Sequence, residues 1–283
     1  MKISLHASSI KYTNILTDIR VAKDAGYYGI EVSATKVNRY LEAGYEVSQL
    51  AGSLGPLRVT MLDVLLSIER RDPGFRRGLL ADCEHMAVLA SRLRCPALQV
   101  VALDDFDAVD WPDKRRHLVA SLNELADIAA PHGIRLGLEP VSFSSFHSIS
   151  QVLDVIHTVG TKRVGLVLDT WHLWTSGTPW QEVADLDPHL IVCAHISDTG
   201  PRVGAKWSDH DRTELPGDGI LPLRRAIQAI CSTGFDGVWA VELLSKRHWE
   251  WEPAVLANEL LRRARSLLGP STHLQSSSHA CRA

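Results

Sequence analysis

The chain has 283 residues, of which 45% are hydrophobic, and a formal net charge of −3 at pH 7. The charge argues against a protein that binds nucleic-acid backbones in general, because such proteins present a basic face. No apolar run approaches the roughly 18 residues of a membrane span, and the N-terminus is a poor signal peptide. Five scattered cysteines without a CxxC pair favour a reduced, cytoplasmic protein.

Short runs rich in β-branched and other apolar residues are typical of buried parallel strands, which need not alternate polar and apolar positions. Amphipathic segments of helical length separate these runs, most clearly at 15–26, 75–93, 114–133 and 148–160, and three of the four end on a glycine. In chain order, the predicted strands are Ile3–His6, Gly29–Val32, Val59–Leu62, Ala97–Ala102, Arg135–Glu139, Val164–Asp169, Ile191–Ile196 and Val238–Glu242.

Eight strands, each followed by a helix, predict a (β/α)₈ TIM barrel as one domain over residues 1–269. The alternative is a doubly wound open sheet. Against it, no Gly-x-Gly-x-x-Gly opens a helix, and eight strands exceed the usual number in such a sheet. The polar, Ser-rich segment 270–283 is predicted to be a disordered tail.

Four consecutive predicted strands end on Glu139, Asp169, His195 and Glu242, and barrel enzymes carry their functional residues at the carboxyl ends of strands. Taken alone, each carboxylate is more typical of a salt bridge or a capped strand end, and His195 is more typical of a hydrogen-bonded histidine in the core. Three carboxylates close together would raise one another's pKa values unless a cation neutralised them. The shared position therefore predicts a site for one divalent metal ion. The oxygen-rich donor set favours Mn²⁺ and leaves Mg²⁺, Co²⁺ and Zn²⁺ open.

The stretch GLVLDTWHLW ends a buried run on Asp169 and His172, three residues apart. A helix cap is the simplest explanation of such a pair. Because Asp169 would emerge at the catalytic rim, we expect the pair to belong to a site instead of a cap.

Five segments, in chain order, resemble the xylose isomerase-like barrel superfamily of sugar isomerases and epimerases, and within it the inosose isomerases: LGLEPV, GLVLDTWHLW, AHISD, DRTELPGDG and AVELL. The resemblance covers the chain from its first strand to its last helix. The resemblance implies the same four metal ligands and places His172 and Arg212 at the substrate. Asp211 precedes that arginine and is a further candidate for a substrate contact. His6 is another candidate, although the inosose isomerases carry a different polar residue at its position.

Aromatic residues surround His172, and Trp171 is the candidate for a substrate contact. An indole wall suits the apolar face of a sugar or cyclitol ring, although helix packing would explain it equally well. The loop 199–209 looks longer than the connection requires, and we expect it to form part of a lid.

The chemistry expected of this set is isomerisation or epimerisation of an α-hydroxyketone, such as 2-keto-myo-inositol, by proton transfer through a metal-stabilised enediolate. Glu139 and Glu242 would be the acid/base pair, and Arg212 would favour the developing negative charge. The nearest alternative is a metal-dependent dehydratase or β-eliminase, with His6 or His172 as its general acid.

Two other functions remain open at this point. An abasic-site endonuclease would need further metal ligands, for which Glu31, Asp63 and Asp104 are the candidates. A non-catalytic sugar-binding barrel would be favoured if the ligand set were broken, but it is intact. We expect a small sugar or cyclitol as the partner, with no nucleic acid and no membrane. Barrels of this superfamily often pair, which is compatible with a homo-oligomer.

Overall fold

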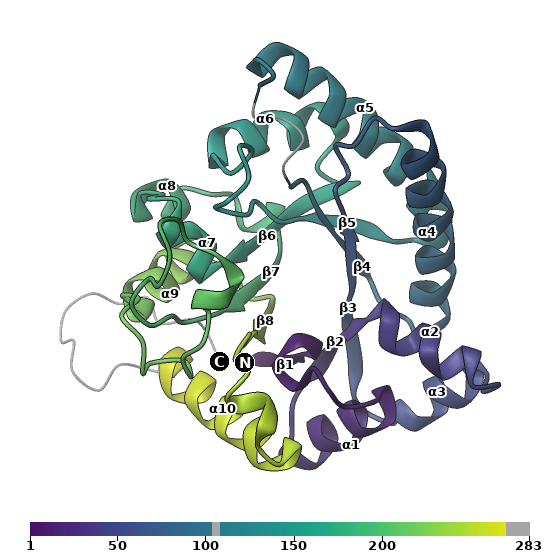
Figure 1. Ribbon diagram of the computed structural model, residues 1–283, viewed down its shortest axis with the longest axis vertical. Coiled ribbons are helices and arrows are strands. Elements are labelled where there is room, and N and C mark those ends of the chain that lie inside the picture. Colours follow the sequence, from purple (N-terminus) through teal and green to yellow (C-terminus); the bar gives the residue numbers. More distant parts are fainter. Residues whose placement is uncertain (104–107, 270–283) are drawn as a thin grey trace.

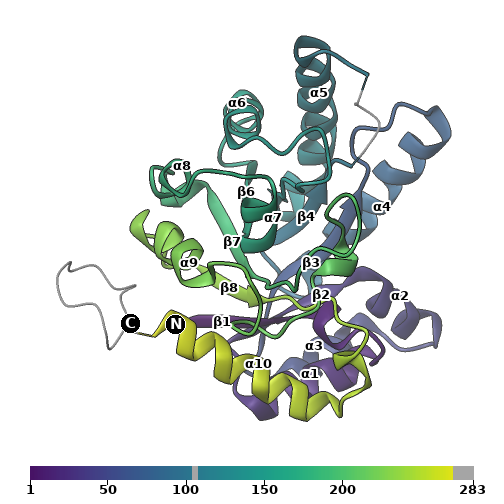
Figure 2. The same cartoon turned by 60° about the vertical axis from the view of Figure 1, so that its left-hand side comes forward.

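The computed structural model describes residues 1–103 and 108–269. Eight parallel strands form a closed barrel in the order β1 to β8, and β8 pairs with β1. Figure 1 shows the helices surrounding the ring of strands, and Figure 2 shows the same arrangement from a second direction. The predicted (β/α)₈ barrel is confirmed. Asp104 and the segment 270–283 lie outside the described residues, so the disordered tail stays a prediction.

Each predicted strand corresponds to an observed one, and most ends agree within one residue. The main difference is the third strand, which continues four residues past its predicted end. The strands are β1 Lys2–His6, β2 Gly29–Ser33, β3 Arg58–Leu66, β4 Ala97–Val101, β5 Arg135–Leu138, β6 Val164–Asp169, β7 Ile191–Ile196 and β8 Val238–Val241.

The helices alternate with the strands, and two connections, β2 to β3 and β6 to β7, contain two helices each. The four segments singled out in the sequence correspond to α1, α4, α5 and α6. The helices are α1 Ile15–Ala25, α2 Ala34–Glu42, α3 Val47–Leu54, α4 Pro73–Arg92, α5 Trp111–Ala129, α6 Ile149–Val159, α7 Thr170–Thr175, α8 Trp180–Ala184, α9 Leu223–Ser232 and α10 Pro253–Leu268.

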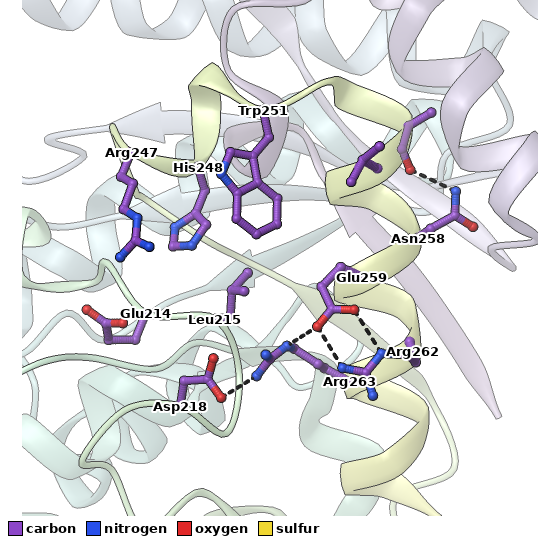
Figure 3. A pocket seen from close by; sticks show the side chains of 12 residues that line it. Glu214, Leu215, Asp218, Arg247, His248, Trp251, Asn258, Glu259, Arg262 and Arg263 are labelled. Atoms are coloured by element: carbon purple, nitrogen blue, oxygen red, sulfur yellow. Dashed lines mark hydrogen bonds and ion pairs between the residues drawn. The ribbon is translucent and has the colours of Figure 1, made fainter.

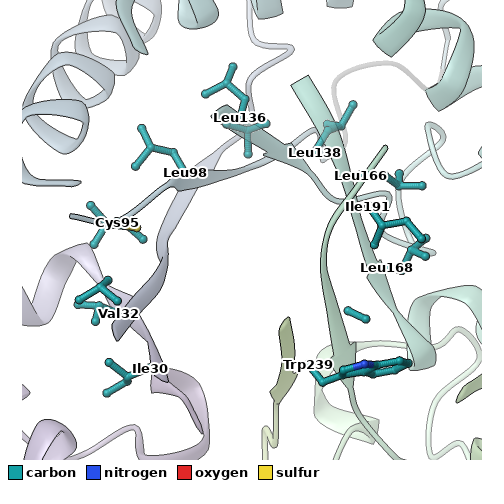
Figure 4. Packing of buried hydrophobic residues seen from close by; sticks show 14 of the residues in the cluster. Ile30, Val32, Cys95, Leu98, Leu136, Leu138, Leu166, Leu168, Ile191 and Trp239 are labelled. Atoms are coloured by element: carbon teal, nitrogen blue, oxygen red, sulfur yellow. The ribbon is translucent and has the colours of Figure 1, made fainter. Parts of the chain in front are cut away.

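The main core lies between the strands and the surrounding helices. Alternate residues of each strand point outward into it, such as Ile30 and Val32 on β2 or Leu166 and Leu168 on β6 (Figure 4). These side chains are at most 1% exposed. Burial of this apolar surface is the dominant favourable contribution to folding.

A smaller apolar cluster fills the interior of the barrel. Its buried members come from five strands. In the sequence, a polar residue follows each member by two positions, on the strand itself or, for Glu242, directly after it. Since strand side chains alternate with period two, the polar residues face inward one level above the apolar cluster. The cluster consists of Met61, Ala97, Val167, Cys193 and Ala240.

Helix α10 is tied to the loop before α9 by a chain of ion pairs (Figure 3). Arg263 contacts Asp218 at 2.6 Å and Glu259 at 2.6 Å, and Glu259 also accepts from Arg262. Hydrogen bonds from Arg262, and then from Arg263, lower the pKa of Glu259 to about 2.

We expect Glu259→Gln to lower the free energy of unfolding by about 0.5–1 kcal/mol at pH 7, the range for partly exposed pairs. Because the folded-state pKa is depressed, this stabilisation is present above the unfolded-state pKa near 4.5 and is lost as the pH falls toward 2. Urea unfolding at pH 7 and pH 3 measures the difference between the proteins. Glu42→Gln, at an exposed position, is the control. The expectation is wrong if the difference in the free energy of unfolding between the wild type and Glu259→Gln is the same at both pH values, or if Glu42→Gln shows an equally large difference.

Among the described helices, none is long and apolar enough to cross a membrane. Cys83, Cys95 and Cys193 are free and buried.

Candidate metal centre and substrate site

The structure brings Glu139, Asp169, His195 and Glu242 together at the carboxyl end of the barrel. Each offers one ligand atom, and these atoms lie within 4.8 Å of one another. Asp169 and His195 are direct neighbours because β6 and β7 pair in that register. Glu139 and Glu242 are the first residues after β5 and β8. All four side chains are buried.

His195 lies at the centre of the group. Its Nδ1 is 3.5 Å from Glu139 Oε1 and 3.4 Å from Glu242 Oε2. Both His195 Nδ1 and Glu139 Oε1 are buried without a hydrogen-bond partner, which is uncommon for buried polar atoms. Unsatisfied oxygen and nitrogen donors that converge in this way fit a divalent cation.

Burial and charge shift the pKa values of this group in different directions. Burial raises the pKa of Glu139 against the effect of His195. Burial alone would also raise the pKa of Glu242, but Arg212 and His6 hold it well below the usual range. Burial would lower the pKa of His195, whereas Glu31 and the neighbouring carboxylates hold it well above 6.5.

Glu31 on β2 contacts the second ring nitrogen of His195, Nε2, which does not face Glu139 and Glu242. Its Oε2 lies 3.1 Å from His195 Nε2, and its Oε1 accepts a hydrogen bond of 2.9 Å from Cys193 Sγ. A carboxylate on the second nitrogen of a metal-binding histidine fixes the orientation and basicity of the ring. Sequence reasoning considered Glu31 only as an endonuclease ligand and missed this contact.

His6 faces the same group of carboxylates from β1. Its Nδ1 accepts a hydrogen bond from Ser8 N–H, so a neutral ring carries its proton on Nε2. That nitrogen is 3.2 Å from Asp63 Oδ2, 3.5 Å from Glu31 Oε2 and 3.9 Å from Glu242 Oε1. Burial, followed by the charge of Glu31, raises the pKa of Asp63 well above its usual range.

Gln99 on β4 is a further site residue that sequence reasoning missed. Its Nε2 donates a hydrogen bond of 2.6 Å to Glu139 Oε2, which leaves Glu139 Oε1 for another partner. Gln99 stands two residues after Ala97, and its register partner on β5 is Gly137, two residues before Glu139. An uncharged residue inside a predicted strand gave no sign of this role.

The expectation that Asp169 does not cap a helix is wrong. Asp169 Oδ1 accepts hydrogen bonds from Trp171 N–H at 2.7 Å and His172 N–H at 3.0 Å, and Asp169 is the N-cap of α7. Its Oδ2 faces the site and accepts from Ser197 Oγ and Arg212 Nη2. One carboxylate therefore starts the helix with one oxygen and serves the site with the other.

His172 is held as a neutral hydrogen-bond donor. Its Nδ1 accepts from Ser142 N–H at 3.1 Å, and burial lowers its pKa to about 4. The neutral ring therefore carries its proton on Nε2, which can donate to an oxygen atom of a ligand.

Arg212 reaches into the group of carboxylates. Its Nη2 donates to Asp169 Oδ2 at 2.9 Å, to Ser197 Oγ at 2.8 Å and to Glu242 Oε2. The side chain is 3% exposed and lies over the ring of Trp171, 5.3 Å from its centroid. Its third described ion-pair partner is Asp209, at 3.3 Å from Nη1.

Two aspartates shape the loop that carries Arg212. Asp211 accepts hydrogen bonds from Val203 N–H and Ser208 N–H, so its carboxylate organises the loop. Asp198 accepts from the N–H groups of Gly217 at 2.8 Å and Gly219 at 3.1 Å. A Cβ on Gly219 would lie 2.5 Å from Asp198 Cγ, so this close approach requires glycine.

We expect Asp198→Asn to lower the free energy of unfolding by about 1.5–3 kcal/mol, because charge-assisted hydrogen bonds to the loop are lost. The loop then holds Arg212 less firmly, so kcat/KM should fall as well. Urea unfolding and steady-state kinetics measure the two effects. The exposed Asp236→Asn serves as the control. Wild-type stability in Asp198→Asn would show that these bonds do not hold the loop.

The aromatic residues pack mainly against one another. Trp171 is fully buried and meets His172 edge-on at 4.8 Å. Trp207, from the predicted lid loop, contacts Trp171 at 6.1 Å and Trp174 at 5.4 Å between ring centroids. Trp171 therefore lies beneath His172 and Arg212 and supports both residues.

Buried carboxylates, imidazoles and an arginine thus lie together at the carboxyl ends of the barrel strands. This arrangement is typical of (β/α)₈ enzymes, whose active sites lie at this end of the barrel. The family model described as "Xylose isomerase-like TIM barrel" matches residues 19–267. The chain belongs to this family.

The chain is similar to several proteins of known name. An inosose isomerase from Halalkalibacterium halodurans is 24% identical over 249 residues, which cover 86% of this chain and 88% of the relative. A 3-dehydroshikimate dehydratase from Pseudomonas aeruginosa is 27% identical over 78% of this chain and 34% of the relative. The crystal structure of the IolI protein with a bound zinc atom superposes with a TM-score of 0.88 at 23% identity, covering 94% of this chain and 98% of that one.

Proposed function

We propose that this chain is an isomerase or epimerase of a sugar-like or cyclitol α-hydroxyketone, and that it uses one divalent cation held by Glu139, Asp169, His195 and Glu242. The observation that carries the proposal is the placement of two buried carboxylates, Glu139 and Glu242, on either side of His195 Nδ1. The inosose isomerases among the relatives support the substrate class.

The four residues fit a cation because unpartnered donor atoms converge in a buried space. When bound, the cation would supply Lewis-acid polarisation of a substrate carbonyl. Three carboxylates and one imidazole favour Mn²⁺ over softer ions. The structural neighbour with a bound zinc atom supports a divalent ion in this chain without deciding which ion the chain uses.

Glu139 and Glu242 are suited to remove a proton beside the carbonyl and to return it. Gln99 holds one oxygen of Glu139, and Arg212 holds one oxygen of Glu242. The remaining Glu139 oxygen, Oε1, has no hydrogen-bond partner and faces His195 Nδ1 at 3.5 Å, so it is the Glu139 atom that would contact the cation and exchange the proton. The assignment of the base to Glu139 therefore rests on this free oxygen.

His172 and Arg212 would bind the substrate oxygens. The neutral His172 offers an Nε2–H donor, and Arg212 offers a fixed positive charge beside the position of a developing enediolate. His6 offers a second Nε2–H donor from the opposite side of the barrel.

Proton exchange with D₂O tests this proposal. Metal-stripped and Mn²⁺-restored enzyme is incubated with 2-keto-myo-inositol and with ketohexoses, and NMR follows deuterium at the carbon next to the carbonyl. We expect exchange with at least one α-hydroxyketone in the restored enzyme and none in the stripped enzyme. The absence of exchange with every compound in the metal-loaded enzyme would refute the isomerase proposal.

A dehydratase is the second candidate, and the position of His6 favours it. Its Nε2–H lies among Asp63, Glu31 and Glu242, where it could protonate a departing hydroxyl group. The two candidates differ in product mass. An isomer of unchanged mass supports the first function, and a product lighter by one water molecule supports the second.

A further inference from the structure

A large cavity lies at the end of the barrel opposite to the candidate metal centre. Its volume is about 1030 Å³, enough for a small-molecule ligand. It is bordered by the N-terminal ends of β3, β4, β5, β7 and β8 and by the segments that follow α3 and α4. None of its lining residues belongs to the candidate metal centre.

The cavity combines an apolar wall with an unbalanced positive charge. Leu57, Val59 and Ile191 are among its buried apolar lining residues. Four arginines also line it, and the described lining contains no aspartate or glutamate. The arginines are Arg58, Arg92, Arg94 and Arg135.

A second cavity provides a useful comparison. The cavity of about 700 Å³ beside α10 also contains arginines, but Arg263 there pairs with Asp218 and Glu259 (Figure 3). Within the described residues, no ion pair involves the four arginines of the larger cavity. Arginines grouped around one cavity without a counter-charge favour an anion there, and their planar guanidinium groups match phosphate and carboxylate groups.

Arg135 shows how the chain places one of these charges at the wall of the cavity. Its Nη2 donates to the carbonyl oxygens of Thr161 at 2.7 Å and His189 at 3.1 Å. A Cβ on Gly165 would lie 2.6 Å from the guanidinium carbon, so glycine makes room for this side chain. The buried Nε of Arg135 has no hydrogen-bond acceptor. A donor of the guanidinium is therefore left unsatisfied.

Arg94 contributes a second unusual feature. It follows α4 with a φ of 54°, in the left-handed region where glycine is the ordinary occupant. Arg94 is one of the residues that line the cavity.

We propose that this cavity binds a small organic anion, whose phosphate or carboxylate group contacts the arginines while its apolar body lies against Leu57, Val59 and Ile191. The proposal concerns a site separate from the candidate metal centre and does not depend on the proposed reaction.

Isothermal titration of the metal-loaded full chain with phenyl phosphate and with benzoate tests the proposal and distinguishes the two anionic groups. Benzyl alcohol serves as the neutral probe. We expect saturable binding of at least one anion, no binding of the alcohol, and an affinity that falls with added NaCl because the contacts are ionic. Arg58→Gln/Arg94→Gln should weaken binding by about tenfold or more, since charge-assisted hydrogen bonds are lost.

The matched control is Arg77→Gln, an exposed arginine on α4 that does not line the cavity. It should bind the anions as the wild type does. Circular dichroism and the melting temperature establish that the double variant is folded. If neither anion binds the wild type saturably, or if the folded double variant binds with wild-type affinity, the proposal is wrong.

Discussion

Glu242→Gln is expected to lower kcat by about 10³-fold, within the range for loss of a positioned acid or base. Glutamine has nearly the same shape, but it cannot accept and return a proton. It also removes a negative charge that faces Arg212 and His195. The measurement is steady-state turnover of the substrate that the D₂O experiment identifies, with Mn²⁺ present.

Glu250→Gln is the matched control, because Glu250 is an exposed glutamate near the same strand end. It should retain wild-type turnover. Near-ultraviolet circular dichroism distinguishes loss of chemistry from loss of structure. A folded Glu242→Gln enzyme with more than a tenth of wild-type turnover would remove Glu242 from the reaction.

Lys36→Met is expected to lower the free energy of unfolding by about 3–5 kcal/mol, the cost of breaking a buried ion pair. Lys36 on α2 contacts Asp18 on α1 at 2.8 Å, and the two side chains are 7% and 0% exposed. Removing the lysine leaves the Asp18 carboxylate buried without its cation. The expected fall in melting temperature is roughly 10 °C for a chain of this size.

The double variant Asp18→Leu/Lys36→Met separates the missing partner from a general packing defect. Replacing both charges with apolar groups is often neutral, so the double variant should recover most of the lost stability. Urea unfolding of the wild type, both single variants and the double variant gives the coupling energy. Equal stability of Lys36→Met and the wild type would show that the pair does not matter for folding.

The fold could be predicted from the sequence because inner barrel strands are buried on both faces. Each therefore appears as a short continuous apolar run, and the run ends where the strand emerges. Such a run does not reveal which residues point inward, because the alternation of polar and apolar positions is absent. The third strand was also predicted too short, since Asp63 lies inside it instead of after its end.

The sequence predicted those residues of the candidate site that are charged and lie at the end of a strand, but it did not reveal the uncharged ones. Glu139, Asp169 and His195 follow this rule, whereas Gln99 and Ser197 do not. Glu31 was noticed, but its contact with His195 depends on the closure of the barrel, which brings β2 and β7 to face each other across the interior. Local sequence does not contain that distance.

The polar residues that face inward above the inner apolar cluster determine where this protein tolerates substitution. Every strand supplies one such side chain, directly or from the residue that follows the strand: His6, Glu31, Asp63, Gln99, Glu139, Asp169, His195 and Glu242. These positions point away from the core between strands and helices, so all of them except Asp169, which also caps α7, can vary without disturbing the packing that holds the barrel closed. New specificities could thus be sought by mutating the other seven positions, with the helices and their apolar contacts left as they are.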